Sequence, residues 1–248
     1  MISKSQISLV KSLHQKKYRK EHQLFIVEGF KAVSEFLNTD FVINTIFCTP
    51  DFSAKVANLS NKQKTYEVSI NELEKISALQ TPQGILAIVE TPKNTPVVAN
   101  DIEEMVLVLD GVQDPGNLGT IIRTADWFGF SHVICSLDCV EVYNPKVVQA
   151  TMGSLTRVKV SYQNLEELLT NTELPIYGTL LAGENIFSTK WHPKGFLVLG
   201  SEGKGISDEL LKLITHPVTI PGGKNTESLN VAIAGAICCA EMSRNKLK

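Results

Sequence analysis

The sequence predicts an α/β protein with two parts, a C-terminal domain on a mainly parallel β-sheet and a smaller N-terminal α/β domain. Strand-like and helix-like segments alternate through residues 97–248, which is typical of a parallel sheet covered by helices. A polar segment with two prolines, residues 91–96, separates two apolar strand-like runs. The 248 residues, 43% hydrophobic and 20% charged, are enough for two modest domains with apolar cores.

In the N-terminal half, residues 1–96, apolar spacing predicts a short mixed domain. Helical spacing appears over residues 5–13 and 29–37, and apolar runs typical of strands over 24–27, 42–48 and 84–89. The C-terminal half, residues 97–248, alternates more regularly. Its predicted strands are residues 105–109, 132–135, 158–160, 176–180, 196–199 and 218–220, and its predicted helices are 118–128, 146–152, 165–169, 208–213 and 231–243.

Three polar, glycine-bearing loops follow strands of the C-terminal half. They are residues 110–117, 200–207 and 221–230. We expect Asn117 to cap the helix after the first loop, with Arg123 about one and a half turns into it, and Ser228 or Asn230 to cap the helix after the third. Because ligands of parallel sheets bind at the carboxyl ends of the strands, we expect the three loops to converge on one site.

Other site chemistries find little support. The second loop carries Gly-Lys but lacks the Ser or Thr that must follow in a nucleoside-triphosphate loop, so a triphosphate hydrolase is disfavoured. The five cysteines form no C-x-x-C pair, and the histidines are scattered, so we expect buried thiols and no metal site. No apolar run reaches the length of a membrane span and the N-terminus has no signal-like apolar region, so a cytoplasmic location is the default expectation.

The formal net charge is −2, but the first 20 residues contain no acidic side chain. Residues 1–96 carry 12 basic and 9 acidic side chains, and residues 97–248 carry 12 and 17. A basic tract can neutralise RNA phosphates, or it can be a solvated terminus. The candidate RNA-binding residues within it are Lys16, Lys17, Arg19 and Lys20.

The three loops resemble the signature motifs of the SpoU (TrmH) family of RNA ribose 2′-O-methyltransferases. The family's Asn-x-Gly-x-x-x-Arg pattern occurs as Asn117, Gly119 and Arg123, and its Gly-Ser-Glu-Gly-x-Gly-Ile pattern as residues 200–206. Its third motif occurs as Ile-Pro at 220–221 and Ser-Leu-Asn-Val-Ala at 228–232. The N-terminal half resembles the family's substrate-binding domain at residues 17–19, 25–29 and 81–84.

The resemblance implies a SPOUT-like α/β domain with a trefoil knot, a homodimer, and S-adenosylmethionine as cofactor. It implies a catalytic set of Asn117, Arg123, Glu202, Ser228 and Asn230. It implies a cofactor pocket formed by Thr179, Leu180, Gly200, Ser201, Ile220 and Leu229.

The activity implied is methylation of a ribose 2′-hydroxyl in structured RNA, with ribosomal RNA first and transfer RNA second. Arg123 then has two open roles: a general base in a strongly perturbed environment, or a cationic clamp on the target phosphate and the developing alkoxide. The alternative function is a non-catalytic RNA-binding module with the same fold.

Overall fold

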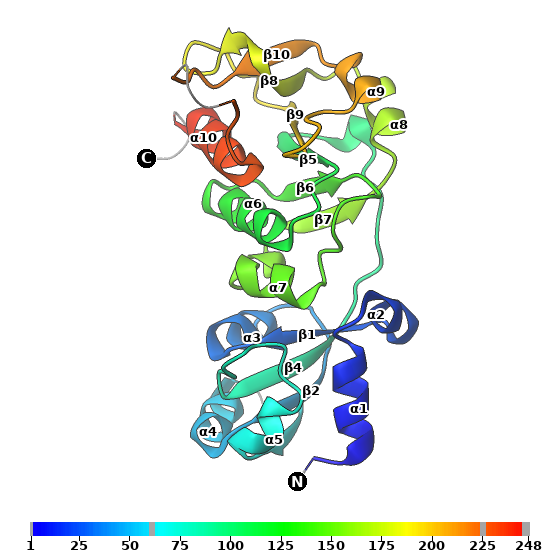
Figure 1. The fold of residues 1–248 in the computed structure, drawn as a ribbon, viewed down its shortest axis with the longest axis vertical. Coiled ribbons are helices and arrows are strands. Elements are labelled where there is room, and N and C mark those ends of the chain that lie inside the picture. The colour runs from blue at the N-terminus through cyan, green and yellow to red at the C-terminus, as the bar shows by residue number, and fades with distance from the viewer. Residues whose placement is uncertain (1, 60–62, 224–226, 245–248) are drawn as a thin grey trace. The chain divides into compact units, whose positions relative to one another are not determined.

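The computed structural model describes residues 2–59, 63–223 and 227–244 (Figure 1). The chain forms two compact units, the first made of residues 1–93 with 141–156 and the second of residues 94–140 with 157–248. The sequence suggested one division, after residue 96. Residues 141–156 join the first unit because helix α7 (Pro145–Thr151) packs against strand β1 (Leu24–Glu28).

The first unit is built on a four-stranded sheet with the order β1-β4-β2-β3. Strand β4 (Ile85–Glu90) is antiparallel to β1 and to β2 (Ile43–Cys48), and β3 (Lys64–Glu67) is parallel to β2. Its further helices are α1 (Lys4–Ser12), α2 (Lys16–His22), α3 (Phe30–Leu37), α4 (Pro50–Leu59) and α5 (Ile70–Glu74). The helices and strands predicted for the N-terminal half are therefore confirmed, and α2, α4, β3 and α5 are additional.

The second unit contains a six-stranded sheet with the order β10-β8-β9-β5-β6-β7, in which every pair is parallel. The strands are β5 (Met105–Asp110), β6 (His132–Cys135), β7 (Lys159–Tyr162), β8 (Ile176–Asn185), β9 (Gly195–Gly200) and β10 (His216–Thr219). The helices are α6 (Pro115–Trp127), α8 (Leu165–Thr170), α9 (Asp208–Leu211) and α10 (Val231–Ser243), with short 3-10 turns η1 (Ala99–Asp101) in this unit and η2 (Ser154–Thr156) in the first. The α/β class predicted from the alternation is confirmed, while the knot stays a prediction.

Helices cover both faces of this sheet (Figure 1). On one face, α8 and α9 pack on alternate residues of β5 and β9, including Val106, Val108 and Val198. On the other, α6 and α10 pack together, and a Cβ on Gly235 of α10 would lie 3.0 Å from the side chain of Leu199. Strands covered on both faces read as continuous apolar runs, which is why residues 105–109 and 196–199 are recognisable from sequence.

All five cysteines are buried, free thiols, as the sequence suggested. In the ranges that the structure describes, no helix has the length and apolar character needed to cross a membrane. Those same ranges hold no cluster of His, Cys, Asp and Glu side chains suited to a metal ion.

Candidate active site

The first loop differs from prediction at the start of α6. The helix is capped by Asp114, whose Oδ1 accepts a hydrogen bond from the backbone N–H of Asn117 at 2.8 Å, and Pro115 occupies the first helical position. Asn117 is therefore not the N-cap but the third residue of the helix. The sequence held the correct signal, since Asp followed by Pro is a standard helix start. The consequence is that the Asn117 side chain is available for contacts outside its own helix.

Asn117 connects the three loops. Its Nδ2 donates a hydrogen bond to Oε1 of Glu202, in the loop after β9, and its Oδ1 accepts one from Nδ2 of Asn230 at 3.0 Å. Asn230 caps α10 as predicted, because its Oδ1 accepts hydrogen bonds from the N–H groups of Ala232 and Ile233 at 3.0 and 3.3 Å. Both ends of the Asn117 amide are thus occupied, and the carboxylate of Glu202 is held at one end of a hydrogen-bonded chain.

The ends of β5 and β9 are also joined directly. Asp110, the last residue of β5, accepts a hydrogen bond from the backbone N–H of Ser207 at 2.7 Å. A Cβ on Gly111, where φ is +68°, would lie 3.7 Å from Cβ of Ser201. Ser201 and Gly205 exchange two backbone hydrogen bonds of 3.0 and 2.9 Å, which closes a tight turn around Glu202. Glu202 is therefore presented at the tip of a turn that is anchored on the neighbouring strand.

A bulge in β8 lies at the same carboxyl edge. Strand β10 pairs with Tyr177 and Gly178 and then with Glu184 and Asn185, so residues 179–183 leave the ladder. Leu181, in the bulge, is 82% exposed, and Leu229 of the third loop is 46% exposed. Apolar side chains left open beside polar loops are suited to an apolar ligand surface such as a purine ring.

The residues predicted to hold the cofactor occupy this edge in different ways. Thr179 donates from Oγ1 to the carbonyl of Val198 at 3.1 Å, and Leu180 is half-buried against the core, so both contribute to the base of the bulge. Gly200 ends β9 opposite Asp110, and Ile220 follows β10 half-buried. Ser228 is exposed and precedes Asn230, and residues 224–226 of the third loop lie outside the described residues.

Arg123 lies apart from the hydrogen-bonded chain within one subunit. It is exposed on α6, six residues after Asn117, and at 3.6 residues per turn this places it on another side of the helix. Its guanidinium makes no hydrogen bond or ion pair with a residue that the structure describes. The same side of α6 carries Trp127, four residues further on and 80% exposed.

Two buried thiols that the sequence did not single out, Cys135 and Cys139, lie next to the first loop and hold it in place. The backbone N–H of Val112 donates to Sγ of Cys139 at 3.2 Å, and Cys139 also contacts Oγ of Ser136 at 3.3 Å. Hydrogen bonding from Cys135, followed by that from Ser136, lowers the pKa of Cys139 to about 7 in spite of burial. Cys139 is buried, so its contacts position the loop next to Gly111.

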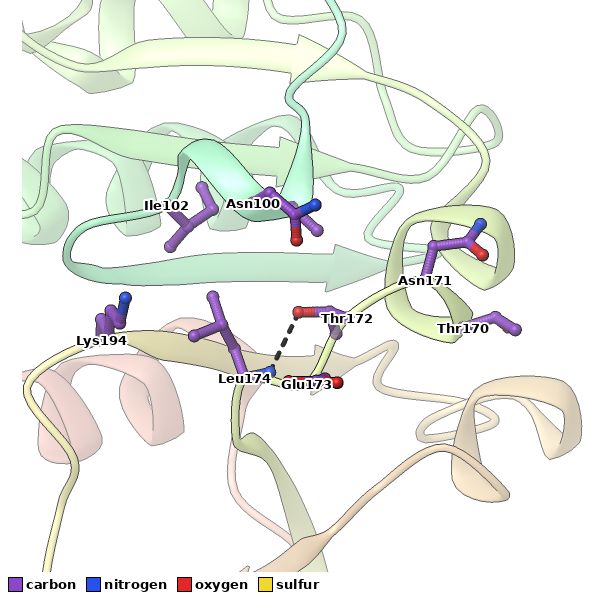
Figure 2. Close-up of a pocket in the computed structure, with 9 residues that line it drawn as sticks. Asn100, Ile102, Thr170, Asn171, Thr172, Glu173, Leu174 and Lys194 are labelled. Carbon is purple, nitrogen blue, oxygen red and sulfur yellow. Dashed lines mark hydrogen bonds between the residues drawn. The ribbon is translucent and has the colours of Figure 1, made fainter.

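The larger of two described cavities lies elsewhere. It has a volume of about 730 Å³ and sits at the amino ends of β5, β8 and β9, between η1 and the segment after α8 (Figure 2). Its lining residues are Ala99, Asn100, Ile102, Thr170, Asn171, Thr172, Glu173, Leu174 and Lys194. No predicted site residue borders it, and parallel sheets bind ligands at the opposite edge, so we do not assign it to the active site.

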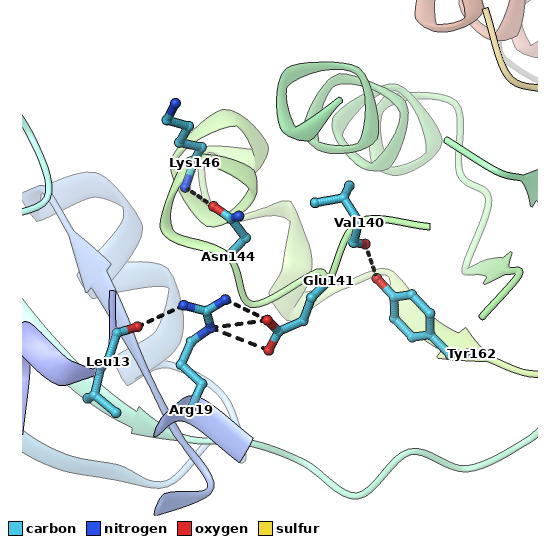
Figure 3. Close-up of polar contacts among 7 residues, drawn as sticks. All are labelled: Leu13, Arg19, Val140, Glu141, Asn144, Lys146 and Tyr162. Carbon is cyan, nitrogen blue, oxygen red and sulfur yellow. Dashed lines mark hydrogen bonds and ion pairs between the residues drawn. The ribbon is translucent and has the colours of Figure 1, made fainter. Parts of the chain in front are cut away.

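The basic tract of the first unit forms helix α2, and its four predicted RNA-binding residues divide into two kinds. Lys16, Lys17 and Lys20 are exposed. Arg19 is 3% exposed, pairs with Glu141 at 2.5 Å and donates from Nη1 to the carbonyl of Leu13 at 2.8 Å (Figure 3). Arg19 therefore anchors the helix and is not available to a phosphate, which corrects its predicted role.

Comparison with known proteins defines the class of this chain. Residues 104–240 match the SpoU rRNA Methylase family, and residues 4–87 match the MRM3-like substrate binding domain. The 23S rRNA (guanosine(2553)-2′-O)-methyltransferase RlmP of Bacillus subtilis is 31% identical over 92% of this chain and 91% of its own length. The 23S rRNA (guanosine-2′-O-)-methyltransferase RlmB of Haemophilus influenzae is 31% identical over 73% of this chain and 78% of its own.

Two solved structures have the same fold as this chain over nearly its full length. A TrmH-family structure from Porphyromonas gingivalis superposes with a TM-score of 0.90 and 39% identity, covering 99% of both chains. An AdoMet-bound rRNA methyltransferase from Sinorhizobium meliloti superposes with a TM-score of 0.89 and 29% identity, covering 100% of this chain and 98% of that one. The fold and the loop site define a SPOUT-class α/β protein. Within that class, the chain belongs to the SpoU rRNA Methylase family.

Proposed function

We propose that this protein transfers a methyl group from S-adenosylmethionine to a ribose 2′-hydroxyl of ribosomal RNA. The observation that carries the proposal is the hydrogen-bonded chain Glu202–Asn117–Asn230, which joins three loops far apart in sequence at the ligand-binding edge of a parallel sheet. The relatives named above act on 23S rRNA, which favours ribosomal over transfer RNA.

The residues present fit the proposed cofactor. The exposed side chains of Leu181 and Leu229 offer apolar surface for an adenine ring, and the Glu202 carboxylate offers a negative charge for a sulfonium. Bound S-adenosylmethionine would supply the electrophilic methyl group. Asn117 holds Glu202 and Asn230 in fixed orientations through both ends of its amide, so little reorganisation is needed at the moment of transfer.

Two features support a homodimer in which Arg123 reaches the site from the partner subunit. Helix α10 has one charged residue, Glu241, in 13, although Ile233 is 50% exposed. Trp127, beside Arg123 on α6, is 80% exposed. A helix that is apolar on all sides is normally buried, so we infer that α6 and α10 pack against a second copy. In the partner subunit's site, Arg123 acts either as general base or as a cationic clamp on the phosphate and the developing alkoxide of the target RNA.

Mapping of ribose methylation in total RNA, from cells with and without this protein, tests the activity. We expect one ribosomal 2′-O-methyl mark to disappear. An unchanged methylation map would refute the ribosomal assignment, and a lost tRNA mark would replace it with the second candidate. We place the protein in the cytoplasm, where ribosomal RNA is accessible to it.

Two further measurements separate the enzyme from a non-catalytic RNA-binding module. Calorimetric titration with S-adenosylmethionine should show binding, and its absence favours the module. A mixture of two inactive variants, Arg123→Lys and Asn230→Ala, should regain part of the methyl transfer if each site takes residues from both subunits. No recovery, with mixed dimers formed, would place Arg123 and Asn230 in the same subunit's site.

A further inference from the structure

Three segments of the first unit meet at one end of its four-stranded sheet. They are residues 29–31 after β1, residues 49–55 after β2 and residues 81–84 before β4. The backbone N–H of Gly29 donates to the carbonyl of Ile85 at 3.1 Å, and that of Thr49 donates to the carbonyl of Gly84 at 2.9 Å. Residues 81–84 are one of the N-terminal motifs found in the sequence, and Gly29 is the last residue of the motif at 25–29; the proposed function has so far used neither motif.

Both motif glycines are in close contact with a side chain from another of the segments. A Cβ on Gly29, where φ is +89°, would lie 2.2 Å from Oε1 of Gln83. A Cβ on Gly84, where φ is +79°, would lie 2.3 Å from Cε2 of Phe52. The two glycines therefore allow the exposed Gln83 amide and the half-buried Phe52 ring to approach the backbone more closely than any side chain at positions 29 and 84 would permit.

The ring of Phe52 is one of a pair. Phe30 and Phe52 have centroids 5.6 Å apart with an interplanar angle of 37°, and neither belongs to the fully buried core. The ammonium of Lys55 lies 4.8 Å from the Phe52 centroid and 5.6 Å from the Phe30 centroid. Lys31 is exposed on the first turn of α3, and Asp51 is the one acidic residue of the three segments.

We propose that this surface, Phe30, Lys31, Phe52, Lys55 and Gln83, binds an unpaired nucleotide of the RNA substrate. Aromatic rings stack with bases that are not paired, lysines neutralise the adjoining phosphates, and an exposed amide hydrogen-bonds a base edge. The inference rests on the proposed function for the identity of the ligand as RNA. It assigns to the first unit the recognition of a single-stranded loop or bulge.

This surface differs from helix α2 in what it recognises. The exposed lysines of α2 supply charge, which attracts any RNA and weakens with salt. The Phe30–Phe52 pair supplies stacking, which requires a base that is free of its partner strand. A duplex therefore engages α2 but not the aromatic pair, and this difference makes the two contributions separable by experiment.

Binding of two labelled RNAs to the full-length protein tests the inference: a hairpin with a single-stranded loop, and a blunt duplex of the same length. Phe30→Leu and Phe52→Leu keep apolar volume but remove the aromatic face. Each should weaken hairpin binding by about tenfold, as expected for loss of one base stack, and leave duplex binding unchanged. Phe187→Leu, at a 49% exposed phenylalanine of the second unit, is the matched control.

Hairpin binding by both variants equal to that of Phe187→Leu would overturn the inference. If either variant unfolds, photo-crosslinking of the wild-type protein to a hairpin with 4-thiouridine in its loop decides: crosslinks on residues 30–31, 52–55 or 83 support the site, and crosslinks confined to other peptides exclude it. Failure of the proposed function is distinguishable, because it would appear as no methyl transfer by the wild type while loop-specific binding persists.

Discussion

The loop site of the second unit and helix α2 of the first unit hold their polar side chains in opposite ways. In the loop site, residues separated by 85 and 113 positions in sequence hydrogen-bond to one another through Asn117. In α2, cations that are neighbours in sequence are divided, because Arg19 is buried on Glu141 while Lys16, Lys17 and Lys20 face solvent.

This difference shows what each kind of sequence signal can predict. A motif of fixed residue types after several strands specifies partners, because parallel strand ends converge at one edge. A run of like charges does not predict which of its side chains are exposed, because the helical period decides which one is buried. The following predictions test that distinction, beginning with the largest expected effect.

Replacing Arg123 with Lys should lower the rate of methyl transfer by about 10³-fold or more, since lysine keeps the charge but loses the planar fork of donors. Affinity for S-adenosylmethionine should stay unchanged, because Arg123 lies outside the Glu202–Asn117–Asn230 chain of its own subunit. Single-turnover methylation and calorimetry measure the two quantities. Near-wild-type turnover would defeat both the general-base and the clamp role.

Replacing Arg19 with Ala should lower the free energy of unfolding by about 3 kcal/mol, because the change leaves the carboxylate of Glu141 without its partner in a site where its side chain is 16% exposed. Chemical denaturation measures the loss. Arg157→Ala is the matched control, since its pair with Asp126 leaves the Arg157 side chain 47% exposed and should cost about 1 kcal/mol or less. Equal losses would show that Arg19 behaves as a surface residue.

Replacing Lys16, Lys17 and Lys20 together with Gln should weaken RNA binding and reduce the slope of log affinity against log salt by about 0.7 to 0.9 for each phosphate that is no longer neutralised. The slope of Arg19→Met should match the wild-type slope, because Arg19 is not exposed. Titrations at several salt concentrations measure both. An unchanged slope in the triple variant would make the tract a solvated surface without a role in binding.

Much of the fold was predictable, and the exceptions have physical reasons. Apolar runs located all six strands of the second unit, and most clearly β5 and β9, because these two are buried along nearly their whole length. Apolar spacing missed α2, whose single buried residue is Arg19, and β3, whose residues Lys64–Glu67 are exposed or half-exposed at a sheet edge. Helix α5 was not predicted, although the sequence contains the signal for it: Ser69 and Glu72 form a capping box.

The candidate site was predictable in its members and not in its geometry. Loop position indicated that Asn117, Glu202 and Asn230 would converge. The Asp-Pro pair at 114–115 does signal the helix start, but sequence alone did not indicate that the Asn117 amide then bridges Glu202 and Asn230. Nor did it indicate the bulge of β8, because a shift of register depends on the partner strand.

The smallest expected effect concerns Glu28, which is buried in the first unit and resembles Asn117 in being held at both ends. Its carboxylate accepts hydrogen bonds from Oγ of Ser77 at 2.5 Å and from the backbone N–H of Ala78 at 2.8 Å. Burial raises the pKa of Glu28 above its usual 4.5, although these hydrogen bonds and His14 oppose the rise. Between pH 4.5 and the raised pKa, Glu28 therefore keeps its proton in the folded state but loses it in the unfolded chain.

The contribution of Glu28 to stability is accordingly complete below pH 4.5 and is lost as pH rises through the raised pKa. In Glu28→Gln, the amide can still accept from Ala78 and donate to Ser77, so the free energy of unfolding should change by about 1 kcal/mol or less. Urea unfolding over a series of pH values should show the wild type losing stability relative to the variant as pH rises above 4.5. A wild type that gains stability relative to the variant over that range would mean that the hydrogen bonds from Ser77 and Ala78, and not burial, dominate at Glu28.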